Sequence, residues 1–443
     1  MMNDDAAKAV PIASWSYTLP TTTRLKVYDK GQSNGLSRLS SPFIPRGAGR
    51  SYGDAAYITN GITLSSQTLD QIGELDAECG TITCESGVEI IQLHRFLEQT
   101  DWAFPIYGGT QWATIGGAVA SDIHGKNDVA QGSFGNHVES IVLLLPDGTS
   151  LECSRDIRPD LFVATIGGMG LTGFIKAVKL KLQKDLPHMV RMRTKIVSGI
   201  TQALACFDSS DHDFQFFSCA GCTGQPADGG LYATASYSEG PDAAPRLALE
   251  FPVPAINFAN LLSWGLGSRT LNIAHRRHYR DIDKRTHIEN YNYVGAPAVF
   301  KHFNKLCGPL IEYQFVVSAD QIQTVFTDLL KLSRARSLAG YGYAMKKFGR
   351  VRRMGLLSFP RPGYTVNFFT KDTPEARAFL TYFTDYLLEL GGRVYLAKDS
   401  CILARQFEAM YDHLDRWREI VRHYDPANRV QSDLSRRLQM KPW

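Results

Sequence analysis

Three glycine-rich segments crowd the first 173 residues of the 443-residue chain and constrain its fold more than any other feature. They are RGAGRSYGD at 46–54, YGGTQWATIGGAVASDIHGKNDVAQGSFGNHVESI at 107–141 and GGMGLTG at 167–173. Glycine lets the backbone N–H groups of a loop point together at anionic oxygens, and its missing Cβ lets a ligand approach. Long irregular loops are uncommon unless they are functional. The pattern predicts three backbone cradles for a phosphate-bearing ligand.

The surroundings of these segments argue against two common nucleotide-binding loops. Gly168, Gly170 and Gly173 satisfy G-x-G-x-x-G, but the Rossmann motif must open a helix. Residues 174–184 instead alternate apolar residues with lysine, as a strand does. The GKN sequence at 125–127 lacks the spaced glycine and the following Ser/Thr of a Walker loop. We therefore expect neither a Rossmann site nor a Walker site.

Composition and charge are those of a globular protein. Hydrophobic residues make up 44%, charged residues 21%, and the net charge is +4 with no Lys/Arg run, so we expect no nucleic-acid partner. The first ten residues carry acids and no apolar core, so we expect no signal peptide. The eight cysteines are then expected to be mostly reduced, in a cytoplasmic protein. The pair Cys219-x-x-Cys222 has no second pair or matching histidines, so we expect no metal site.

The periodicity changes near residue 186 and predicts two regions. Before this point short β-type runs alternate with turns, Pro146-Asp147-Gly148 predicts a hairpin, and residues 88–101 have helical spacing. After it, aromatic-rich strands at 213–219, 231–237, 311–317 and 363–369 alternate with amphipathic helices at 319–335 and 374–392. A further helix is expected over 407–426, where a proline stops it. The chain is thus predicted to be α+β, with helices packed on one face of the second region's sheet.

Six segments, in the same order along the chain, resemble the FAD-binding oxidoreductases of the vanillyl-alcohol-oxidase (PCMH-type) family. They are RGAGRSYGD, TIGGAVASDIHGKN, GSFGNHV, ATIGGMGLTG, YLAKDS and QSDLSRRL. Within the family the chain is most similar to oxidases of a polyprenylphosphoryl-β-D-ribose. The resemblance implies a two-domain PCMH-type fold. Residues 1–186 and 393–443 would form the FAD-binding domain, and residues 187–392 a substrate domain of antiparallel sheet flanked by helices.

The resemblance implies FAD as the cofactor, held mainly by the glycine-rich segments. The expected contacts are Pro45, Arg46, Gly47, Ala48, Gly49, Arg50, Ser51, Tyr52, Gly53, Asp54, Ala55, Gly109, Thr114, Ile115, Gly116, Gly117, Ser121, Asp122, Ile123, His124, Ile175 and Tyr395. Many relatives bond the flavin covalently through a histidine at the position of Arg50. Arginine stays protonated and is not a nucleophile, so we expect non-covalent FAD.

The resemblance also implies oxidation of a sugar carbinol. Such a reaction requires a C–H bond held against the flavin and an acceptor for the hydroxyl proton. Lys398, His124 and Lys126 are the expected catalytic residues, with Lys398 as an electrostatic and hydrogen-bonding group and His124 as a proton acceptor or orienting group. Tyr52, Gln314, Lys346, Asn367 and Lys398 are expected to line the substrate pocket. Without the resemblance, the sequence alone would place Lys398 on the solvated surface and give His124 the role of capping a loop.

Two positions depart from the ribose-oxidase relatives. Asn367 stands where they carry a cysteine, and it keeps the volume while adding hydrogen-bonding groups. Glu312 stands where they carry a glutamine, and it places a carboxylate near the expected position of a substrate phosphate. The second departure argues against an identical lipid substrate.

Three functions follow from these observations. The first is oxidation of the 2-hydroxyl of a polyprenylphosphoryl-β-D-ribose to the 2-keto sugar, the first half of an epimerisation to the arabinose lipid that a separate NAD(P)H-dependent ketoreductase would complete. The second is an aldonolactone or alditol oxidase that uses O2. The third, of another class, is a non-catalytic FAD-binding module. A lipid-linked sugar requires a wide apolar opening, whereas a free sugar requires a closed polar pocket.

One apolar segment, at 251–268, fits none of the motifs above. It is barely long enough to span a bilayer and contains Pro252 and Pro254, so we expect no transmembrane helix. The cationic sequence HRRHYR follows at 275–280. An apolar flap beside a basic cluster suits a prenyl phosphate at an anionic membrane. We expect either a lid with peripheral contact at the inner face of the membrane or an ordinary packed connection.

Overall fold

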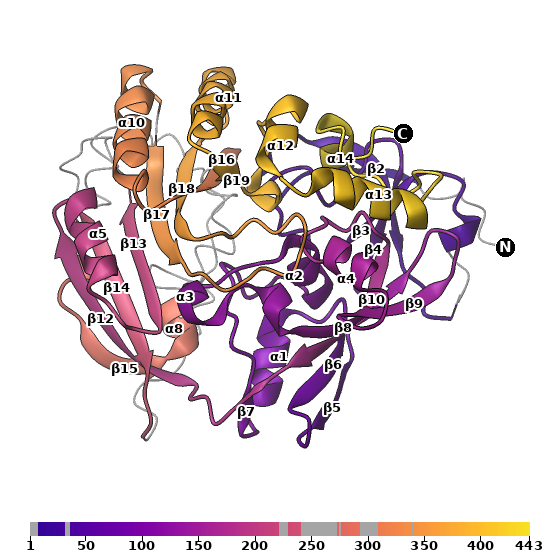
Figure 1. Cartoon of the computed structure of the whole chain (residues 1–443), viewed down its shortest axis with the longest axis horizontal. Coiled ribbons are helices and arrows are strands. Elements are labelled where there is room, and N and C mark those ends of the chain that lie inside the picture. The colour runs from indigo at the N-terminus through magenta and orange to yellow at the C-terminus, as the bar shows by residue number, and fades with distance from the viewer. Residues whose placement is uncertain are drawn as a thin grey trace.

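The computed structural model describes residues 8–31, 36–220, 229–240, 273, 276–292, 309–338 and 340–443. All structural statements below concern these residues. The strands of the first 184 residues and the large sheet that follows lie side by side, and the C-terminal helices return over the first part (Figure 1). The fold is α+β, as predicted.

Three small sheets form the first part. One has the order β1 (Ala9–Ile12), β2 (Thr21–Val27), β4 (Ile62–Ser65), β3 (Phe43–Arg46), and the last three strands are parallel. The second is antiparallel, in the order β5 (Ile72–Asp76), β6 (Thr81–Glu85), β10 (Phe174–Lys181), β8 (Val138–Leu144), β9 (Ser150–Ser154). The predicted hairpin is confirmed as the β8–β9 connection. A third sheet pairs β7 (Trp102–Ala103) with β11 (Gln183–Lys184).

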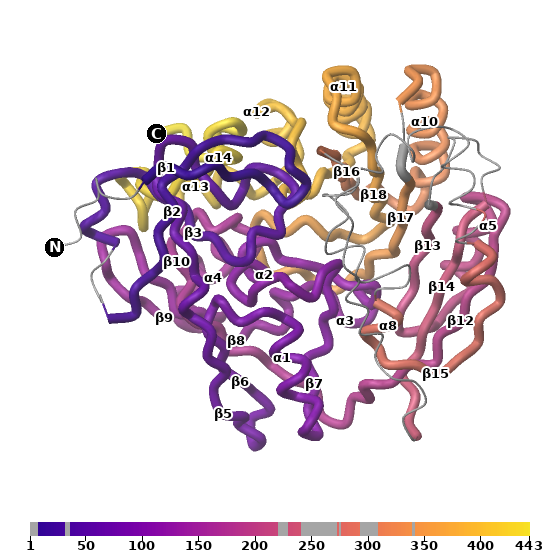
Figure 2. Tube along the Cα trace, turned by 180° about the vertical axis from the view of Figure 1, so that it is seen from behind, coloured from indigo at the N-terminus to yellow at the C-terminus, as the bar shows by residue number. Residues whose placement is uncertain are grey.

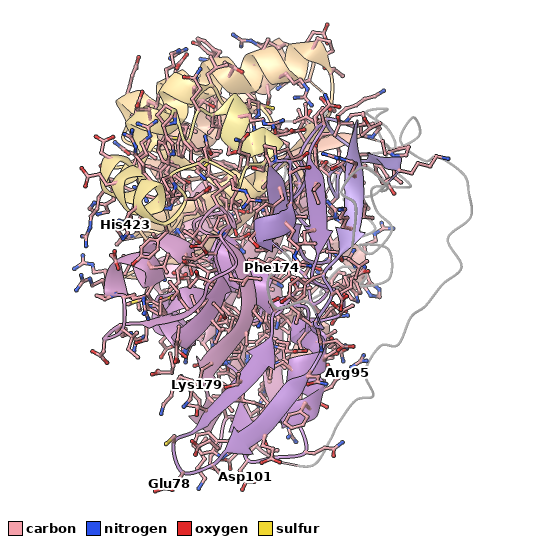
Figure 3. All side chains as sticks on the ribbon, turned by 90° about the vertical axis from the view of Figure 1, so that its right-hand side faces the viewer. Glu78, Arg95, Asp101, Phe174, Lys179 and His423 are labelled. Atoms are coloured by element: carbon pink, nitrogen blue, oxygen red, sulfur yellow. The ribbon has the colours of Figure 1, made fainter. Side chains whose placement is uncertain are left out.

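Short helices connect these strands. They are α1 (Ile90–Leu97), α2 (Ile115–Ser121), α3 (Asp128–Gln131) and α4 (Pro159–Thr165). The predicted helix over 88–101 is confirmed as α1, which buries Ile90, Leu93 and Leu97 on one face. In the side view, Glu78 and Asp101 mark the tip of this part, away from His423 on the C-terminal helices (Figure 3).

The second region is one antiparallel sheet of eight strands. Its order is β15 (Asp283–His287), β12 (Met189–Val197), β14 (Gly230–Tyr237), β13 (Phe214–Ala220), β17 (Gly340–Phe348), β18 (Gly363–Lys371), β16 (Leu310–Val317), β19 (Arg393–Val394). The four aromatic-rich strands predicted from the sequence are therefore confirmed. Because β19 pairs with β16, the sheet extends to Val394. The domain boundaries at 186 and 393 remain a prediction.

One face of the large sheet is covered by helices. These are α5 (Ile200–Asp208), α10 (Ile322–Ala335) and α11 (Pro374–Glu389), of which α10 and α11 confirm two predicted helices. Side chains alternate along each strand, so Phe217, Met345 and Phe368 pack into the core with these helices. The residues between them face the other way, toward the first part of the chain. That opposite face carries the site described below.

The last fifty residues form α12 (Ala404–Met410), α13 (Leu414–Tyr424) and α14 (Asp433–Arg437). The single helix expected over 407–426 is therefore wrong, because Tyr411 adopts an extended conformation between two helices. Arg393 explains the break: its Nε donates to the carbonyl oxygen of Met410 at 3.1 Å, which satisfies the end of α12. The end of α12 thus depends on a residue of strand β19.

The C-terminal segment clasps the N-terminal loops. Phe43 forms a parallel bridge with Val430, and the backbone N–H of Gln431 donates to the carbonyl of Phe43 at 2.9 Å. Arg437 donates to both carboxylate oxygens of Asp54, at 2.8 and 2.9 Å. Viewed from behind, β1 to β3 lie beside α13 and α14 (Figure 2). The two ends of the chain therefore build one side of the molecule together.

Within the described ranges, no helix has the length and apolar character needed to cross a bilayer. The predicted lid at 251–268 lies outside the described residues, as does Cys222 of the C-x-x-C pair. The basic sequence at 275–280 is described from Arg276 onward, and Arg277, His278 and Arg280 are exposed there.

Candidate active site

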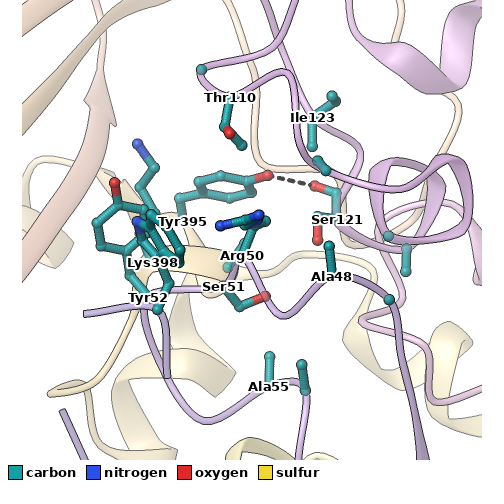
Figure 4. A pocket seen from close by; sticks show the side chains of 18 of the residues that line it. Ala48, Arg50, Ser51, Tyr52, Ala55, Thr110, Ser121, Ile123, Tyr395 and Lys398 are labelled. Atoms are coloured by element: carbon teal, nitrogen blue, oxygen red, sulfur yellow. Dashed lines mark hydrogen bonds between the residues drawn. The ribbon is translucent and has the colours of Figure 1, made fainter. Parts of the chain in front are cut away.

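A cavity of about 560 Å³ lies between the N-terminal loops and the free face of the large sheet (Figure 4). It brings together most of the residues predicted from the sequence. Those that line it are Pro45, Gly47, Ala48, Gly49, Arg50, Ser51, Tyr52, Ala55, Gly109, Thr114, Gly116, Gly117, Ser121, Ile123, His124, Lys126, Ile175, Lys346, Asn367, Tyr395 and Lys398. Its walls are the loop after β3, the segment around α2 and the large sheet, and they are built in different ways.

The first wall is the loop that follows the buried strand β3. Its path depends on glycine at two positions. Gly49 has φ +65°, which L side chains rarely adopt, and a Cβ on Gly47 would lie 2.1 Å from Oγ1 of Thr114. The second contact brings this loop against the start of α2, which is the other glycine-rich segment. The two segments thus meet edge to edge at the cavity.

The backbone N–H groups of residues 48–51 donate to no other group in the described part of the chain. Buried or half-buried amides require an acceptor, and adjacent free amides form an anion site. These amides fit the pyrophosphate of FAD. Arg50 stands over the Trp15 ring, with its Cζ 4.4 Å from the ring centroid, and its burial lowers the guanidinium pKa. The loop therefore offers oriented donors and one cation to a phosphate-bearing ligand.

The second wall, around α2, lacks free amides in its first turn. The N–H of Gly116 donates to the carbonyl of Ser86 at 2.9 Å, and the N–H of Gly117 donates to Thr114 Oγ1 at 3.3 Å. A Cβ on Gly116 would lie 2.7 Å from Cβ of Ser86. Close packing, and not a set of anion donors, therefore explains Gly116 here. The third segment places Gly170 and Gly173 on the cavity and runs directly into β10, which confirms the strand predicted after it.

Six predicted site residues do not line the cavity. They are Arg46, Gly53, Asp54, Ile115, Asp122 and Gln314. Several brace the walls from behind: Asp54 pairs with Arg437, Asp122 accepts from the N–H of Gly135 at 2.8 Å, and Ile115 is fully buried in the core. Arg46 donates to the carbonyl of Ala56 at 3.1 Å. Gly53 abuts the backbone of Asp399, where a Cβ would overlap the carbonyl oxygen.

Lys398 forms the centre of a polar cluster on the sheet wall. Its Nζ makes a short ion pair with the carboxylate of Glu312, which is only 3% exposed and also accepts from Nδ2 of Asn367. The Nζ lies 5.5 Å from the ring centroid of Tyr52. Burial and the Glu312 carboxylate raise the pKa of Tyr52 well above its usual value. The cluster thus contains a paired charge and a phenol that stays protonated.

His124 lies in the cavity wall between two strands of the large sheet. Lys346 Nζ lies 3.3 Å from its Nδ1, and the side-chain amide of Gln314 lies 3.1 Å from its Nε2. Thr365 on β18 links the two neighbours of the ring, because it pairs in register with Lys346 on β17 and its Oγ1 accepts from Nε2 of Gln314 on β16 at 2.9 Å. Burial, then the charges of Lys346 and Lys398, lower the pKa of His124 well below its usual value. The imidazole is therefore neutral.

The pKa of the Lys346 ammonium group lies near neutrality. Burial and the charge of Lys398 lower it to about 7, against the opposing effect of Glu312 and Asp128. Its ammonium group can therefore lose a proton at physiological pH. A group of this kind can take up the proton released when a hydroxyl is oxidised.

Lys126 occupies a different corner of the cavity. Its Nζ donates to the backbone carbonyls of Tyr291 and Asn292, at 3.1 and 2.9 Å, and lies 3.9 Å from the ring centroid of Phe216. Burial and the charge of Lys346 lower its pKa well below the usual value. These contacts join the loop before α3 to α8 (Ile288–Asn292), the helix that follows β15. Lys126 is thus a bridging group at the cavity wall, away from the Lys398–Glu312 pair.

The sequence reasoning missed several cavity residues. They include Trp15, Ser86, Thr110, Met169, Phe174, Phe216, Ser218, Asn292, Ala344 and Phe369. Phe216, Ser218 and Phe369 alternate with Phe217 and Phe368, which pack under the helices. The alternation of side chains along these strands is visible in the sequence, but it does not show which face of a strand meets the ligand.

Tyr395 closes the cavity behind the second wall. Its hydroxyl donates to the carbonyl of Ser121 at 2.9 Å, as the dashed line in Figure 4 shows, and its ring stacks on Phe359 at 4.7 Å. Tyr52 and Lys398 lie together on one side of Arg50, and Ala48 and Ser121 lie on the other. The arrangement separates a backbone-lined end, suited to phosphates, from a side-chain-lined end, suited to chemistry.

Comparisons with known proteins agree with this division. The family model for an FAD binding domain matches residues 36–154, which contain the first two glycine-rich segments. Decaprenylphosphoryl-beta-D-ribose oxidase of Mycolicibacterium smegmatis is 28% identical over 97% of this chain and 97% of its own length. L-gulonolactone oxidase of Mus musculus is 28% identical over 39% of this chain and 38% of its own. D-2-hydroxyglutarate dehydrogenase of Rattus norvegicus is 27% identical over 35% and 30%.

The shorter matches cover about the extent of one domain, whereas the match to the ribose oxidase also covers the large sheet and the C-terminal helices. The cavity accounts for this pattern, because relatives can share loops that bind one cofactor while their sheet walls differ. The loops, the free amides and the family model all agree with FAD. The chain contains an FAD binding domain, is an FAD-dependent oxidoreductase, and is similar along nearly its whole length to decaprenylphosphoryl-beta-D-ribose oxidase.

Proposed function

We propose that the protein oxidises the 2-hydroxyl of a polyprenylphosphoryl-β-D-ribose to the 2-keto sugar, with FAD held non-covalently. This would be the first half of an epimerisation that a separate NAD(P)H-dependent ketoreductase completes. The observation that carries the proposal is the match to a named ribose oxidase over 97% of both chains, which includes the sheet wall and its Lys398. The contacts of the two cavity walls support it.

The residue roles follow from the two ends of the cavity. The free amides of residues 48–51 and the Arg50 guanidinium would hold the pyrophosphate of FAD. When bound, FAD supplies the hydride acceptor. Lys398 would donate to the oxygen of the reacting carbinol and stabilise negative charge there, while Asn367 and Tyr52 orient the sugar.

The hydroxyl proton requires a neutral acceptor close to the carbinol. Lys346, whose pKa is about 7, fits this role, and the neutral His124 beside its Nζ would position it. Lys126 is held by two backbone carbonyls, so it would shape the wall and not exchange this proton. The individual roles of these residues are part of the proposal.

Non-covalent FAD rests on Arg50. Its guanidinium is not a nucleophile, and its stacking over Trp15 occupies it in a binding role. Denaturation of the purified yellow protein in acid should release all of the flavin into the supernatant. Flavin that stays with the precipitated chain would show a covalent bond and would contradict this part of the proposal.

A second candidate is an aldonolactone or alditol oxidase that uses O2. One specific feature favours it: Glu312 places a buried carboxylate against Lys398, which suits the hydroxyls of a neutral sugar better than a phosphate. The gulonolactone oxidase relative matches only 39% of this chain, so it supports this alternative less. The two candidates share the flavin chemistry and differ in the substrate.

Anaerobic mixing with candidate substrates would separate the two candidates. The FAD-loaded protein is mixed with a short-chain polyprenylphosphoryl ribose, an aldonolactone and an alditol, and the flavin absorbance near its visible maximum is followed. We expect rapid bleaching with the ribose lipid and slow bleaching with the others. Bleaching by the lactone or alditol alone would replace the first proposal with the second. A peripheral membrane contact, proposed for the exposed Arg277 and Arg280, can be checked by co-sedimentation with anionic vesicles.

A further inference from the structure

A cluster outside the cavity joins the first part of the chain to the large sheet. Glu98 follows directly after α1, while His287 ends β15 and Glu289 lies in α8. One donor atom from each of these side chains lies within 4.8 Å of the other two. In both overall views α8 lies between β15 and the N-terminal part (Figures 1 and 2). The three residues thus come from the two regions that enclose the cavity.

The cluster contains a buried carboxylate oxygen without a partner. Glu289 is 9% exposed, and its Oε1 accepts no hydrogen bond from the described residues. A carboxylate in this position is costly unless a proton or a cation neutralises it. A second carboxylate, that of Glu98, lies beside it and increases the local negative charge. Among the described residues, Oε1 of Glu289 is therefore open to a cation.

The third donor is an imidazole. Nε2 of His287 lies 3.3 Å from Oε1 of Glu98, so the ring faces the gap between the carboxylates. The imidazoles of His188 and His94 are near enough for His287 to lower the pKa of each, after the larger effect of burial. One imidazole with two carboxylates is a donor set for first-row transition ions, whereas Ca²⁺ and Mg²⁺ prefer oxygen ligands alone.

We propose that Glu98, His287 and Glu289 form a binding site for a first-row divalent cation, with Zn²⁺ as the test ion. Three protein ligands leave at least one position of a tetrahedral ion for water. The donor atoms must approach one another by about an ångström, because Zn–N and Zn–O bonds are about 2 Å long. The site lies at the protein surface, where the exposed fractions of the Glu98 and His287 side chains, 19% and 11%, leave a path for the ion.

Loading of the site requires a change of tautomer. The backbone N–H of Glu289 lies 3.2 Å from Nδ1 of His287, so the proton of the neutral ring resides on Nε2 in the empty site. Coordination through Nε2 moves that proton to Nδ1, and the backbone contact is lost. The cation thus replaces one long hydrogen bond and one imidazole–carboxylate contact with three metal–ligand bonds.

Occupancy of the site would affect the cavity through α8. The helix ends at Asn292, whose backbone carbonyl and that of Tyr291 hold Lys126. Asn292 also lines the cavity. A cation that joins α1 to the start of α8 would therefore fix one cavity wall against the other. This inference does not depend on which sugar is oxidised.

The test measures Zn²⁺ binding to the FAD-loaded protein after dialysis against a chelator. We expect saturable binding of one ion per chain by calorimetry, a higher unfolding midpoint with Zn²⁺, and no competition from Mg²⁺. Glu289→Gln and His287→Gln should each weaken the affinity by more than about tenfold, since even outer-shell changes cost that much. Glu152→Gln and His423→Gln change exposed residues elsewhere and should bind as the parent does.

Two results would overturn the proposal. One is the absence of saturable Zn²⁺ binding, and the other is unchanged affinity in both ligand variants. If His287→Gln fails to fold, as judged by its circular dichroism, the Glu289→Gln variant decides. An anomalous diffraction peak at the zinc edge, in crystals of the parent grown with Zn²⁺, provides an independent measurement. A peak only at other residues would refute the assignment.

Discussion

The loop wall of the cavity presents backbone groups, whereas the sheet wall presents side chains. The loop wall, residues 45–55, offers backbone amides, and its glycines bring it within van der Waals contact of α2. The sheet wall offers side chains, with Lys398, Glu312 and Asn367 in one hydrogen-bonded cluster. A wall made of backbone tolerates few substitutions but binds one fixed group. A wall made of side chains can change its ligand by single substitutions.

This difference explains the pattern among the relatives. L-gulonolactone oxidase and D-2-hydroxyglutarate dehydrogenase match only 39% and 35% of the chain. In this chain the loop wall offers backbone amides suited to a phosphate-bearing cofactor. The sheet wall is where we expect specificity to reside. Four substitutions test this division.

The largest effect is expected from Gly116→Val in the second wall. Its Cβ would meet Ser86 at 2.7 Å, so the side chain would force apart two segments that line the cavity. We expect complete loss of bound FAD, measured as the flavin-to-protein absorbance ratio of the purified variant. Gly31→Val is the matched control, because its nearest neighbour is the exposed side chain of Asp29. A variant that retains full FAD would show that the loops do not form the cofactor wall.

The second test is Lys398→Ala on the sheet wall. FAD should remain bound, while flavin reduction by the substrate slows by roughly 10²- to 10³-fold, the loss seen when one preorganised donor is removed. Stopped-flow absorbance measures the rate. Lys371→Ala, at the exposed end of β18, is the control.

A complication of this variant is the buried carboxylate that it leaves without a partner. Breaking such a pair typically destabilises a protein by about 3–5 kcal/mol. The double variant Lys398→Ala/Glu312→Gln removes both charges, so its reduction rate reports the loss of the Lys398 amine without an unpaired buried carboxylate. A normal reduction rate in the double variant would exclude Lys398 from the reaction.

The third test is the pH dependence of flavin reduction. If neutral Lys346 accepts the proton, the anaerobic rate should rise about tenfold per pH unit below 7 and level off above it. The sign follows because the neutral amine, which forms as the pH rises, is the active species. Lys346→Met should flatten the profile, whereas Lys347→Met, whose side chain pairs with Asp208 on the other face, should not. A rate that falls through pH 7 would instead assign the lysine cation to substrate binding.

The smallest effect is expected from Glu312→Gln. The change removes one negative charge beside Lys398, so a phosphate-bearing sugar should bind roughly three- to tenfold more tightly, as measured by its KM. A neutral lactone should bind no better. Asp208→Asn, on the far face of the sheet, serves as the control. Improved KM for the lactone alone would indicate that the sheet wall is built for neutral sugars.

The walls also differ in how well the sequence predicted them. The loop wall was accessible because glycine spacing reports backbone conformation directly, and eight residues from Pro45 to Ala55 line the cavity. Arg46, Gly53 and Asp54 lie in the same motif but brace it from behind, because a motif does not specify which side chains point inward. Gln314, which was predicted to line the pocket, likewise lies behind His124 and contacts its ring.

The sheet wall was harder because its members come from separate strands. Phe216 and Ser218 were missed since the strand at 213–219 was predicted without a ligand-facing side. The break between α12 and α13 was missed for a related reason, because Arg393 reaches the carbonyl of Met410 from another element. Periodicity describes one element at a time, whereas these features depend on pairs of elements.

The clasp between the chain ends has a consequence for synthesis on the ribosome. Phe43 pairs with Val430, and Asp54 binds Arg437, so the loop wall is braced by residues made last. Tyr52 is also tied by its backbone N–H to the carbonyl of Ala397, at 2.9 Å. N-terminal domains generally fold first during translation. Here the N-terminal loops lack their contacts with Val430 and Arg437 until the final helix has emerged. We expect nascent chains that stop before residue 430 to bind no flavin, so cofactor loading would follow chain release.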